Sequence, residues 1–141
     1  MALTPYFFAL ICMLCWGLAP LSGKAGLAKV PPFAALLIRS FAVSAILLAG
    51  GLLGGQLQQL PRIDARSASY IVLEGVLASL LGQLAYYYAL KYGAASRVIP
   101  IASAFPVVAF VGALLLFGEK LTWPKGVGMG LIVAGILLLR R

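Results

Sequence analysis

The order of apolar and polar positions divides the chain into five long apolar runs separated by short polar segments. The runs cover residues 5–27, 33–53, 68–90, 98–117 and 121–139. A bilayer's hydrocarbon core is about 30 Å thick and a helix rises about 1.5 Å per residue, so one crossing needs roughly 20 mostly apolar residues. Each run has about that length. The pattern therefore predicts an all-α integral membrane protein with about five transmembrane helices, in a single domain over residues 1–141.

Helix-breaking residues mark the ends of these runs. Pro31 and Pro32 end the first run, because a proline disfavours helical backbone in the residue before it. The polar stretch 56–67 follows the second run and is expected to form an exposed loop or an interfacial turn. Pro100 and Pro106 interrupt the fourth run, and each removes a backbone donor, so kinks are predicted there. The carbonyls freed at these kinks need partners, so the kinks should face protein or water.

The composition of the chain indicates whether water or lipid surrounds its helices. The chain is 63% hydrophobic and 10% charged, with a mean hydropathy of +1.07. No soluble domain of this size could surround that much apolar material with a polar surface, so the lipid bilayer must surround the helices. The net charge is +8, but the Lys and Arg residues are spread between the apolar runs. Such spreading argues against nucleic-acid binding and suits the anchoring of loops.

The residue types leave little room for catalysis or for a metal. The sequence contains no His and no cluster of carboxylates, and its two cysteines, Cys12 and Cys15, lie within an apolar run. A metal site or a nucleophile, base and oxyanion set needs such groups close together. We therefore expect no metal, no cofactor and no enzymatic activity.

The charges that flank the runs predict an orientation in the cell (inner) membrane. Five crossings place alternate loops on opposite sides. Four cations belong to one side: Arg62, Arg66, Lys120 and Lys125. Six belong to the other, together with the C-terminus: Lys24, Lys29, Lys91, Arg97, Arg140 and Arg141. The excess favours a cytoplasmic C-terminus. If Lys24 lies inside the first helix the balance becomes five against four, and insertion in both orientations is then an open alternative.

Two charges fall inside predicted helices. Arg39 and Glu74 each lie about six residues from the start of their run, or about 9 Å deep. They enter from opposite sides, so within one copy their depths differ by about 12 Å in a core of about 30 Å. An inverted second copy would bring its Arg39 to the depth of Glu74, which suggests an ion pair across an antiparallel dimer. The alternative, which we favour, is that each side chain reaches towards its nearer interface.

Other residues are candidates for a substrate path or for helix pairing. Ser79, Gln83 and Tyr86 or Tyr87 share one face of the third predicted helix, where they could contact a polar solute or hydrogen-bond to another helix. Trp16 could line a cavity for apolar or cationic solutes, or simply pack. The last run presents small residues at four-residue spacing, which either let another helix approach closely or reflect the high glycine content of membrane helices. These small residues are Gly126, Gly130 and Ala134.

Several short motifs occur in a characteristic order. They are Trp16-Gly17, the lone Arg39, Tyr86-Tyr87-Tyr88-Ala89-Leu90-Lys91, Ala94-Ala95-Ser96, Pro106, Gly118-Glu119-Lys120-Leu121 and a glycine-rich last run. Over nearly its whole length the chain resembles an EamA-type domain of the drug/metabolite transporter superfamily. The resemblance implies a small-molecule transporter or exporter built from two inverted five-helix units around a central path, with Pro106 among the residues of that path.

This sequence has one such unit. The resemblance therefore implies an antiparallel homodimer or an inverted partner chain, such as an inverted paralogue, by analogy with the small multidrug resistance proteins. Those relatives use a Glu in their first helix, and residues 5–27 contain no acidic residue, so that mechanism is not transferred. A subunit of a lipid-linked solute flippase and a non-transporting membrane scaffold remain alternatives.

Overall fold

The chain folds into two compact helical units. The computed structural model describes residues 4–139, and side chains are described for residues 5–138. The first unit is Met1–Tyr92 and the second is Gly93–Arg141. All regular elements among the described residues are helices. Arg140 and Arg141, which entered the charge balance, lie outside the described residues.

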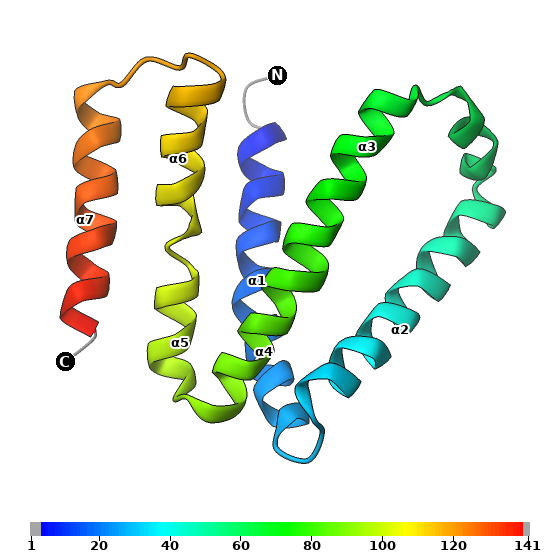
Figure 1. Cartoon of the computed structure of the whole chain (residues 1–141), viewed down its shortest axis with the longest axis horizontal. Coiled ribbons are helices and arrows are strands. Elements are labelled where there is room, and N and C mark those ends of the chain that lie inside the picture. Colours follow the sequence, from blue (N-terminus) through cyan, green and yellow to red (C-terminus); the bar gives the residue numbers. More distant parts are fainter. Residues whose placement is uncertain (1–3, 140–141) are drawn as a thin grey trace. The chain divides into compact units, whose positions relative to one another are not determined.

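The first unit contains three long helical rods (Figure 1). Helices α1 (Thr4–Leu27) and α2 (Pro32–Leu53) come first, and the 3₁₀ helix η1 (Gln56–Arg62) follows them. The third rod is continuous, but its helix type changes from α to π and back to α along its length. It consists of α3 (Ala65–Glu74), the π-helical segment η2 (Gly75–Gly82) and α4 (Gln83–Tyr92).

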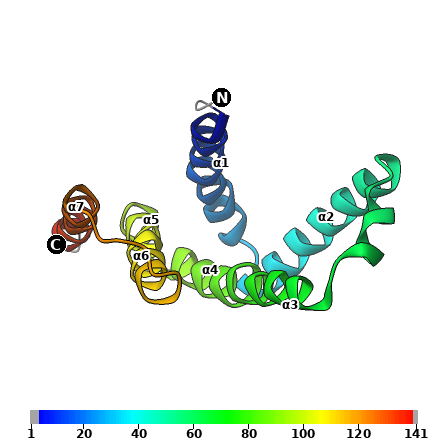
Figure 2. The same cartoon turned by 90° about the horizontal axis from the view of Figure 1, so that it is seen from above.

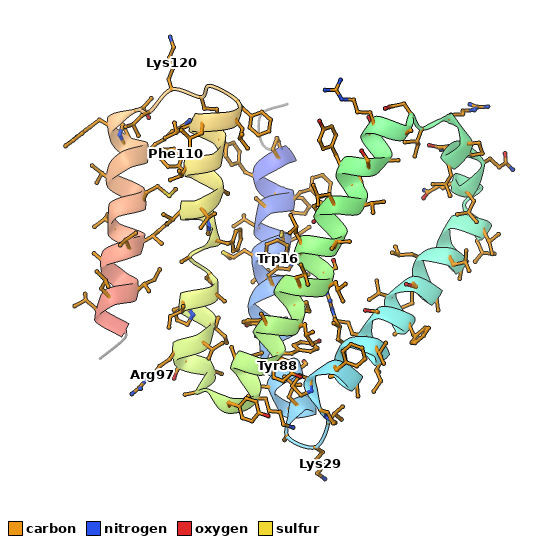
Figure 3. All side chains as sticks on the ribbon, viewed as in Figure 1. Trp16, Lys29, Tyr88, Arg97, Phe110 and Lys120 are labelled. Atoms are coloured by element: carbon orange, nitrogen blue, oxygen red, sulfur yellow. The ribbon has the colours of Figure 1, made fainter. Side chains whose placement is uncertain are left out.

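The second unit is a helical hairpin. Helices α5 (Ala95–Ala102) and α6 (Phe105–Leu116) together make one rod, and α7 (Trp123–Leu139) packs against both of them (Figure 1). Arg97, near the start of α5, and Lys120, between α6 and α7, lie at opposite ends of this unit (Figure 3). Cations at the two ends of an apolar rod are what a membrane-spanning hairpin requires.

The prediction of about five transmembrane helices is confirmed. Among the described residues, four helical stretches are long and apolar enough to cross a membrane. They are Pro5–Leu27, Pro32–Leu53, Ala65–Tyr92 and Ala95–Leu116. A shorter apolar helix, Trp123–Leu138, is the fifth.

Local capping explains where the third rod differs from the prediction. It begins at Ala65, three residues before the expected start, because the Asp64 side chain accepts a hydrogen bond of 2.8 Å from the Ser67 backbone N–H. Such a cap satisfies one of the donors left free at a helix N-terminus. The expected loop over 56–67 is exposed, but most of it is the helix η1.

The interruption of the fourth predicted helix falls between its two prolines. The rod starts at Ala95, and Ser103 and Ala104 separate α5 from α6. Pro106 lies at the start of α6, where a residue without a backbone N–H leaves no hydrogen bond unmade. A short break therefore precedes Pro106, whereas Pro100 lies inside α5, where the predicted kink remains a prediction.

Very few apolar side chains are buried within the chain. Leu27, Leu36 and Leu90 are the buried hydrophobic side chains among the described residues, and they come from α1, α2 and α4. Apolar groups elsewhere point outwards, as Phe41 does with 73% of its surface exposed and Leu53 with 91%. Such a surface is compatible with lipid and not with water.

The three buried leucines mark the point where the first unit is held together. Helices α1, α2 and α4 pack against one another near the turn that joins α1 to α2. Away from that end the rods spread apart in both views of the unit (Figures 1 and 2). The closest packing of the unit therefore lies at one end of the rods.

Candidate substrate-binding cleft

A cleft of about 250 Å³ lies between α1, α2 and α4. Its walls are mostly apolar, and Arg39 and Tyr87 supply its polar side chains. The lining residues are Gly23, Gly26, Leu27 and Val30 from α1 and the following turn, Ala35, Ile38 and Arg39 from α2, and Tyr87 from α4.

Two glycines of α1 keep this space open. Gly23 and Gly26 are three residues apart and so share one face of the helix. A methyl group on Gly23 would lie 3.8 Å from Cε1 of Tyr87, which is an ordinary contact. A methyl group on Gly26 would meet no atom within 4 Å. A larger side chain at position 26 would therefore enter the cleft without colliding with the protein at its Cβ.

Two lysines tie together the helix ends that border the cleft. The Lys24 ammonium donates to the carbonyl of Leu90, and the Lys91 ammonium donates to the carbonyls of Leu27 and Val30, both at 3.0 Å. The last carbonyls of a helix lack partners within it and carry the negative end of its dipole. Each lysine thus caps the C-terminal end of the other helix. We call this arrangement the lysine clasp.

The lysine clasp also answers the question about Lys24. This residue lies in the last turn of α1, inside the helix. Its ammonium is engaged with α4 and does not belong to the loop. Without Lys24 the charge count from the sequence is five against four, with the terminal arginines included. Lys91 lies in the last turn of α4 and is engaged in the same way, and without it as well the count is four against four.

Arg39 lines the open cleft as an exposed cation. It lies seven residues after Pro32, or about 10 Å along α2. Among the described residues it forms no hydrogen bond or ion pair. A charge at the centre of a membrane helix costs about 2.5–3.5 kcal/mol on insertion scales, so an unpaired arginine beside a cleft is a candidate for a functional role.

The acidic residues of the chain are placed elsewhere. The sequence has three, of which Asp64 caps α3 and Glu119 pairs with Lys125 at 3.3 Å. Glu74 ends α3 on an exposed position and does not line the cleft. Within the described part of the chain, no carboxylate therefore neutralises the cleft.

The structure brings together two of the residues singled out from the sequence, Arg39 and Tyr87. Trp16 lies midway along α1, with 64% of its surface exposed, and is not part of the cleft lining (Figure 3). Gln83 and Tyr86 are half-buried on α4. Pro106 belongs to the second unit. The roles suggested for these four residues in a substrate path remain predictions.

Ser79 lies in the π-helical segment. The face shared by Ser79, Gln83 and the tyrosines was derived from α-helical spacing, which does not hold over Gly75–Gly82. A π-helix pairs residues five apart and so turns less per residue. The alignment of Ser79 with Gln83 is therefore still a prediction.

The small residues of the last helix differ in their surroundings. On α7, Gly126 is half-buried, and a methyl group there would lie 3.7 Å from Leu121. Gly130 and Ala134 are exposed, and a methyl group on Gly130 would meet nothing within 4 Å. The chain itself leaves this part of the small-residue face uncovered.

Sequence reasoning missed the glycines of the cleft and the lysine clasp. The signal for the glycines was their three-residue spacing around Lys24, in a run otherwise free of charge. The clasp had no comparable signal, because Lys24 and Lys91 are far apart in sequence and only the packing of α1 on α4 brings them to each other's helix ends.

Apolar helices that expose their side chains, with an open and mostly apolar cleft between three of them, define a multi-pass membrane protein. Residues 3–141 match the model of the EamA-like transporter family. The chain belongs to that family. No solved structure shows significant similarity to it.

Relatives of different lengths are similar in sequence to this chain over part or nearly all of it. An uncharacterized transporter from the region 3′ of cobO in a Sinorhizobium species is 34% identical over 133 residues, which is 94% of each chain. An uncharacterized protein of Methanocaldococcus jannaschii is 38% identical over 76 residues, covering 54% of this chain and 55% of the relative. An uncharacterized protein of Pseudomonas aeruginosa is 35% identical over 112 residues, covering 79% of this chain but 37% of the relative.

Proposed function

We propose that this chain is half of a small-molecule transporter or exporter, and that it acts as an antiparallel homodimer or with an inverted partner chain. The observation that carries the proposal is the cleft between α1, α2 and α4, in a chain of a transporter family. Its volume of about 250 Å³ lies just below the range of roughly 300–1,000 Å³ that is typical of complete ligand pockets. A second unit placed against the cleft would complete the pocket.

Inversion of the second unit is supported by topology. Many transporters combine two inverted repeats and bind their substrate at the interface between them. The Pseudomonas relative extends well beyond the match, which covers 37% of its length, so it has room for a second unit. An exposed small-residue face at Gly130 and Ala134 offers a surface on which a helix of the second copy can pack.

The charge balance supports insertion in both orientations. With Lys24 inside α1, the loop charges are five against four, a bias too small to impose one orientation. Within this proposal the protein resides in the cell (inner) membrane, and its C-terminus lies in the cytoplasm in a slight majority of copies. Copies of both orientations supply the two halves of the antiparallel dimer.

Two measurements test the proposal. Reporters fused after Arg141 should give signal on both sides of the membrane. The purified full chain, reconstituted into vesicles, should transport members of a panel of cationic, neutral and anionic solutes above the level of protein-free vesicles. Flux that requires a co-expressed partner would replace the homodimer by a heteromeric transporter. Absence of flux in both preparations, with the chain still assembled in a larger complex, would identify a scaffold and contradict transport.

A further inference from the structure

We infer that the cleft binds a small amphipathic anion, in which a carboxylate is attached to an apolar body of about one ring. In this arrangement the exposed Arg39 guanidinium receives the carboxylate at the open side of the cleft, and the apolar walls contact the body. The inference rests on the proposed function and names the substrate class for the same site.

The charges around the cleft favour an anion. Arg39 lines the cleft and has no partner among the described residues, and the two ammonium groups of the lysine clasp lie on the helix ends that border it. The clasp ammoniums are offset by helix carbonyls, but Arg39 is not offset by any group of the described chain. A cleft of one charge sign with apolar walls concentrates the field and attracts the opposite charge.

The donor geometry favours a carboxylate. A guanidinium is planar and presents its N–H groups as a fork that matches the two oxygens of a carboxylate. The half-buried Tyr87 lines the cleft from the facing helix, and its phenolic hydroxyl is a second possible donor. These two side chains are the polar ones of the lining, so the site offers donors for one anionic group and no further charged partner for a second polar group.

The remaining walls select an apolar body of limited size. Leu27, Val30 and Ile38 present aliphatic surface, and Gly23 and Gly26 leave the space that the body occupies. A cleft of about 250 Å³ admits a single-ring carboxylate such as benzoate, but it cannot enclose a lipid with two acyl chains. We therefore assign the site to a soluble solute, and the alternative of a lipid headgroup, whose chains would stay in the bilayer, is left to a comparison of lipids.

Benzoate binding to the purified full chain in a maltoside detergent tests the inference. Benzoate should bind, whereas benzamide and benzylammonium, which share its shape but not its charge, should bind at least tenfold more weakly. The R39Q variant should lose at least tenfold in benzoate affinity. The R39K variant keeps the charge but not the fork, and it should fall between R39Q and the native chain.

A pair of glycine substitutions in α1 tests the location. Gly26→Leu should fill the cleft and weaken benzoate binding at least tenfold. Gly17→Leu is the matched control, because a methyl group at Gly17 also meets nothing within 4 Å and Gly17 does not line the cleft. Gly17→Leu should bind benzoate like the native chain. Equal effects of the two substitutions, or R39Q binding at native affinity, would overturn the inference.

Two further measurements test whether Arg39 instead pairs with Glu74 of an inverted copy or binds a lipid headgroup. If Arg39 is instead neutralised by Glu74 of an inverted copy, E74Q will raise benzoate affinity at least tenfold by releasing the arginine, and this result overturns the inference; unchanged affinity in E74Q supports it. Benzoate should bind equally well in nanodiscs of phosphatidylcholine and in nanodiscs that contain phosphatidylglycerol. Loss of binding in the latter would assign Arg39 to the lipid headgroup.

The failure of this inference can be distinguished from the failure of the proposed function. If vesicles transport a neutral or cationic solute but R39Q binds benzoate like the native chain, transport stands and the anion site is wrong. If benzoate binds through Arg39 and Gly26→Leu blocks it, but no solute crosses the vesicle membrane, the site stands and transport is wrong.

Discussion

At the scale of single residues, the lysine clasp supplies hydrogen-bond donors to carbonyls at the ends of two membrane helices. The last carbonyls of α1 and α4 need donors, and each helix receives them from a lysine of the other. A lysine suits this role because its flexible stem lies along apolar surface while its ammonium reaches a polar partner. The two residues therefore stabilise the helix ends that form the cleft.

Replacing Lys91 by methionine tests the clasp. Lys91→Met keeps the apolar stem but removes the hydrogen bonds to the carbonyls of Leu27 and Val30. Charged hydrogen bonds of this kind contribute about 1.5–3 kcal/mol, so we expect a loss near the lower end of that range for a part-buried group. Thermal unfolding in detergent measures it. Lys29→Met, at the exposed lysine of the turn after α1 (Figure 3), is the control and should have little effect. Equal unfolding temperatures for the two variants would contradict a stabilising clasp.

Asp64 gives the first unit a predictable response to acid. The hydrogen bond from the Ser67 backbone N–H, helped by the Ser67 hydroxyl, lowers the pKa of the Asp64 carboxyl below its ordinary value. A carboxyl with a lowered pKa in the folded state contributes stability that is fully present above its unfolded pKa, about 4. This contribution is lost as the pH falls through the lower folded pKa.

The Asp64→Asn variant isolates that contribution. Asparagine caps a helix about as well as aspartate but does not titrate. The native chain should therefore lose more of its thermal stability than Asp64→Asn when the pH is lowered from 7 to 3. Asp64→Ala should be less stable than both at pH 7, because it cannot accept the Ser67 hydrogen bond. Parallel pH profiles for the native chain and Asp64→Asn would show that the cap is not the acid-sensitive element.

At the scale of elements, the sequence predicts the membrane spans, which depend on hydropathy, but not the features that depend on how the helices pack. The five spans follow from run length, because lipid requires about 20 apolar residues per crossing. Arg39 and Tyr87 could be found as polar groups in apolar runs. The glycines that open the cleft could not be assigned to it, since their role depends on how α1 crosses α4. The π-helical segment was also missed, because its residues are as apolar as those of any membrane helix.

Gly82 explains where the π-helical segment forms. A methyl group on Gly82 would lie 2.9 Å from the carbonyl oxygen of Leu77, closer than real contacts of this kind. Gly82→Ala should therefore force the segment to rearrange, at a cost of about 1–3 kcal/mol in the free energy of unfolding. It should also rotate α4 relative to α3, which would move Tyr87 and weaken ligand binding in the cleft.

Gly75 supplies the matched control for this prediction. It begins the same segment, and a methyl group there meets nothing within 4 Å. Gly75→Ala should unfold at the same temperature as the native chain or slightly higher, since alanine is the better helix former. Hydrogen exchange over residues 77–83 should change in Gly82→Ala and not in Gly75→Ala. If both variants behave alike, the π-helical segment does not depend on Gly82.

At the scale of the whole molecule, the proposed association of two copies has a candidate surface on α7. Three buried hydrophobic side chains and a cleft of about 250 Å³ form a small interior for a transporter. The exposed apolar faces are compatible with lipid, but contact with lipid does not require small residues such as Gly130 and Ala134, which are exposed on α7. Small residues allow close backbone approach, and in membranes such approach drives helix association through van der Waals contact.

The association of two copies should therefore depend on Gly130. Gly130→Leu adds bulk to the exposed small-residue face of α7 but meets no atom of its own chain at the Cβ. We expect the dimer dissociation constant to rise at least tenfold, which corresponds to about 1.4 kcal/mol. Gly17→Leu is the control, because Gly17 is an exposed glycine of α1 with equally free surroundings and no small residue three or four positions away that could extend a close-packing face. Counting the copies per particle by photobleaching in lipid vesicles, across a range of protein-to-lipid ratios, measures the constant. Dimers that withstand Gly130→Leu as well as Gly17→Leu would place the interface on another surface. The cleft side of α1 and α2 would then be the next surface to test, since a second unit covering the cleft would also complete it.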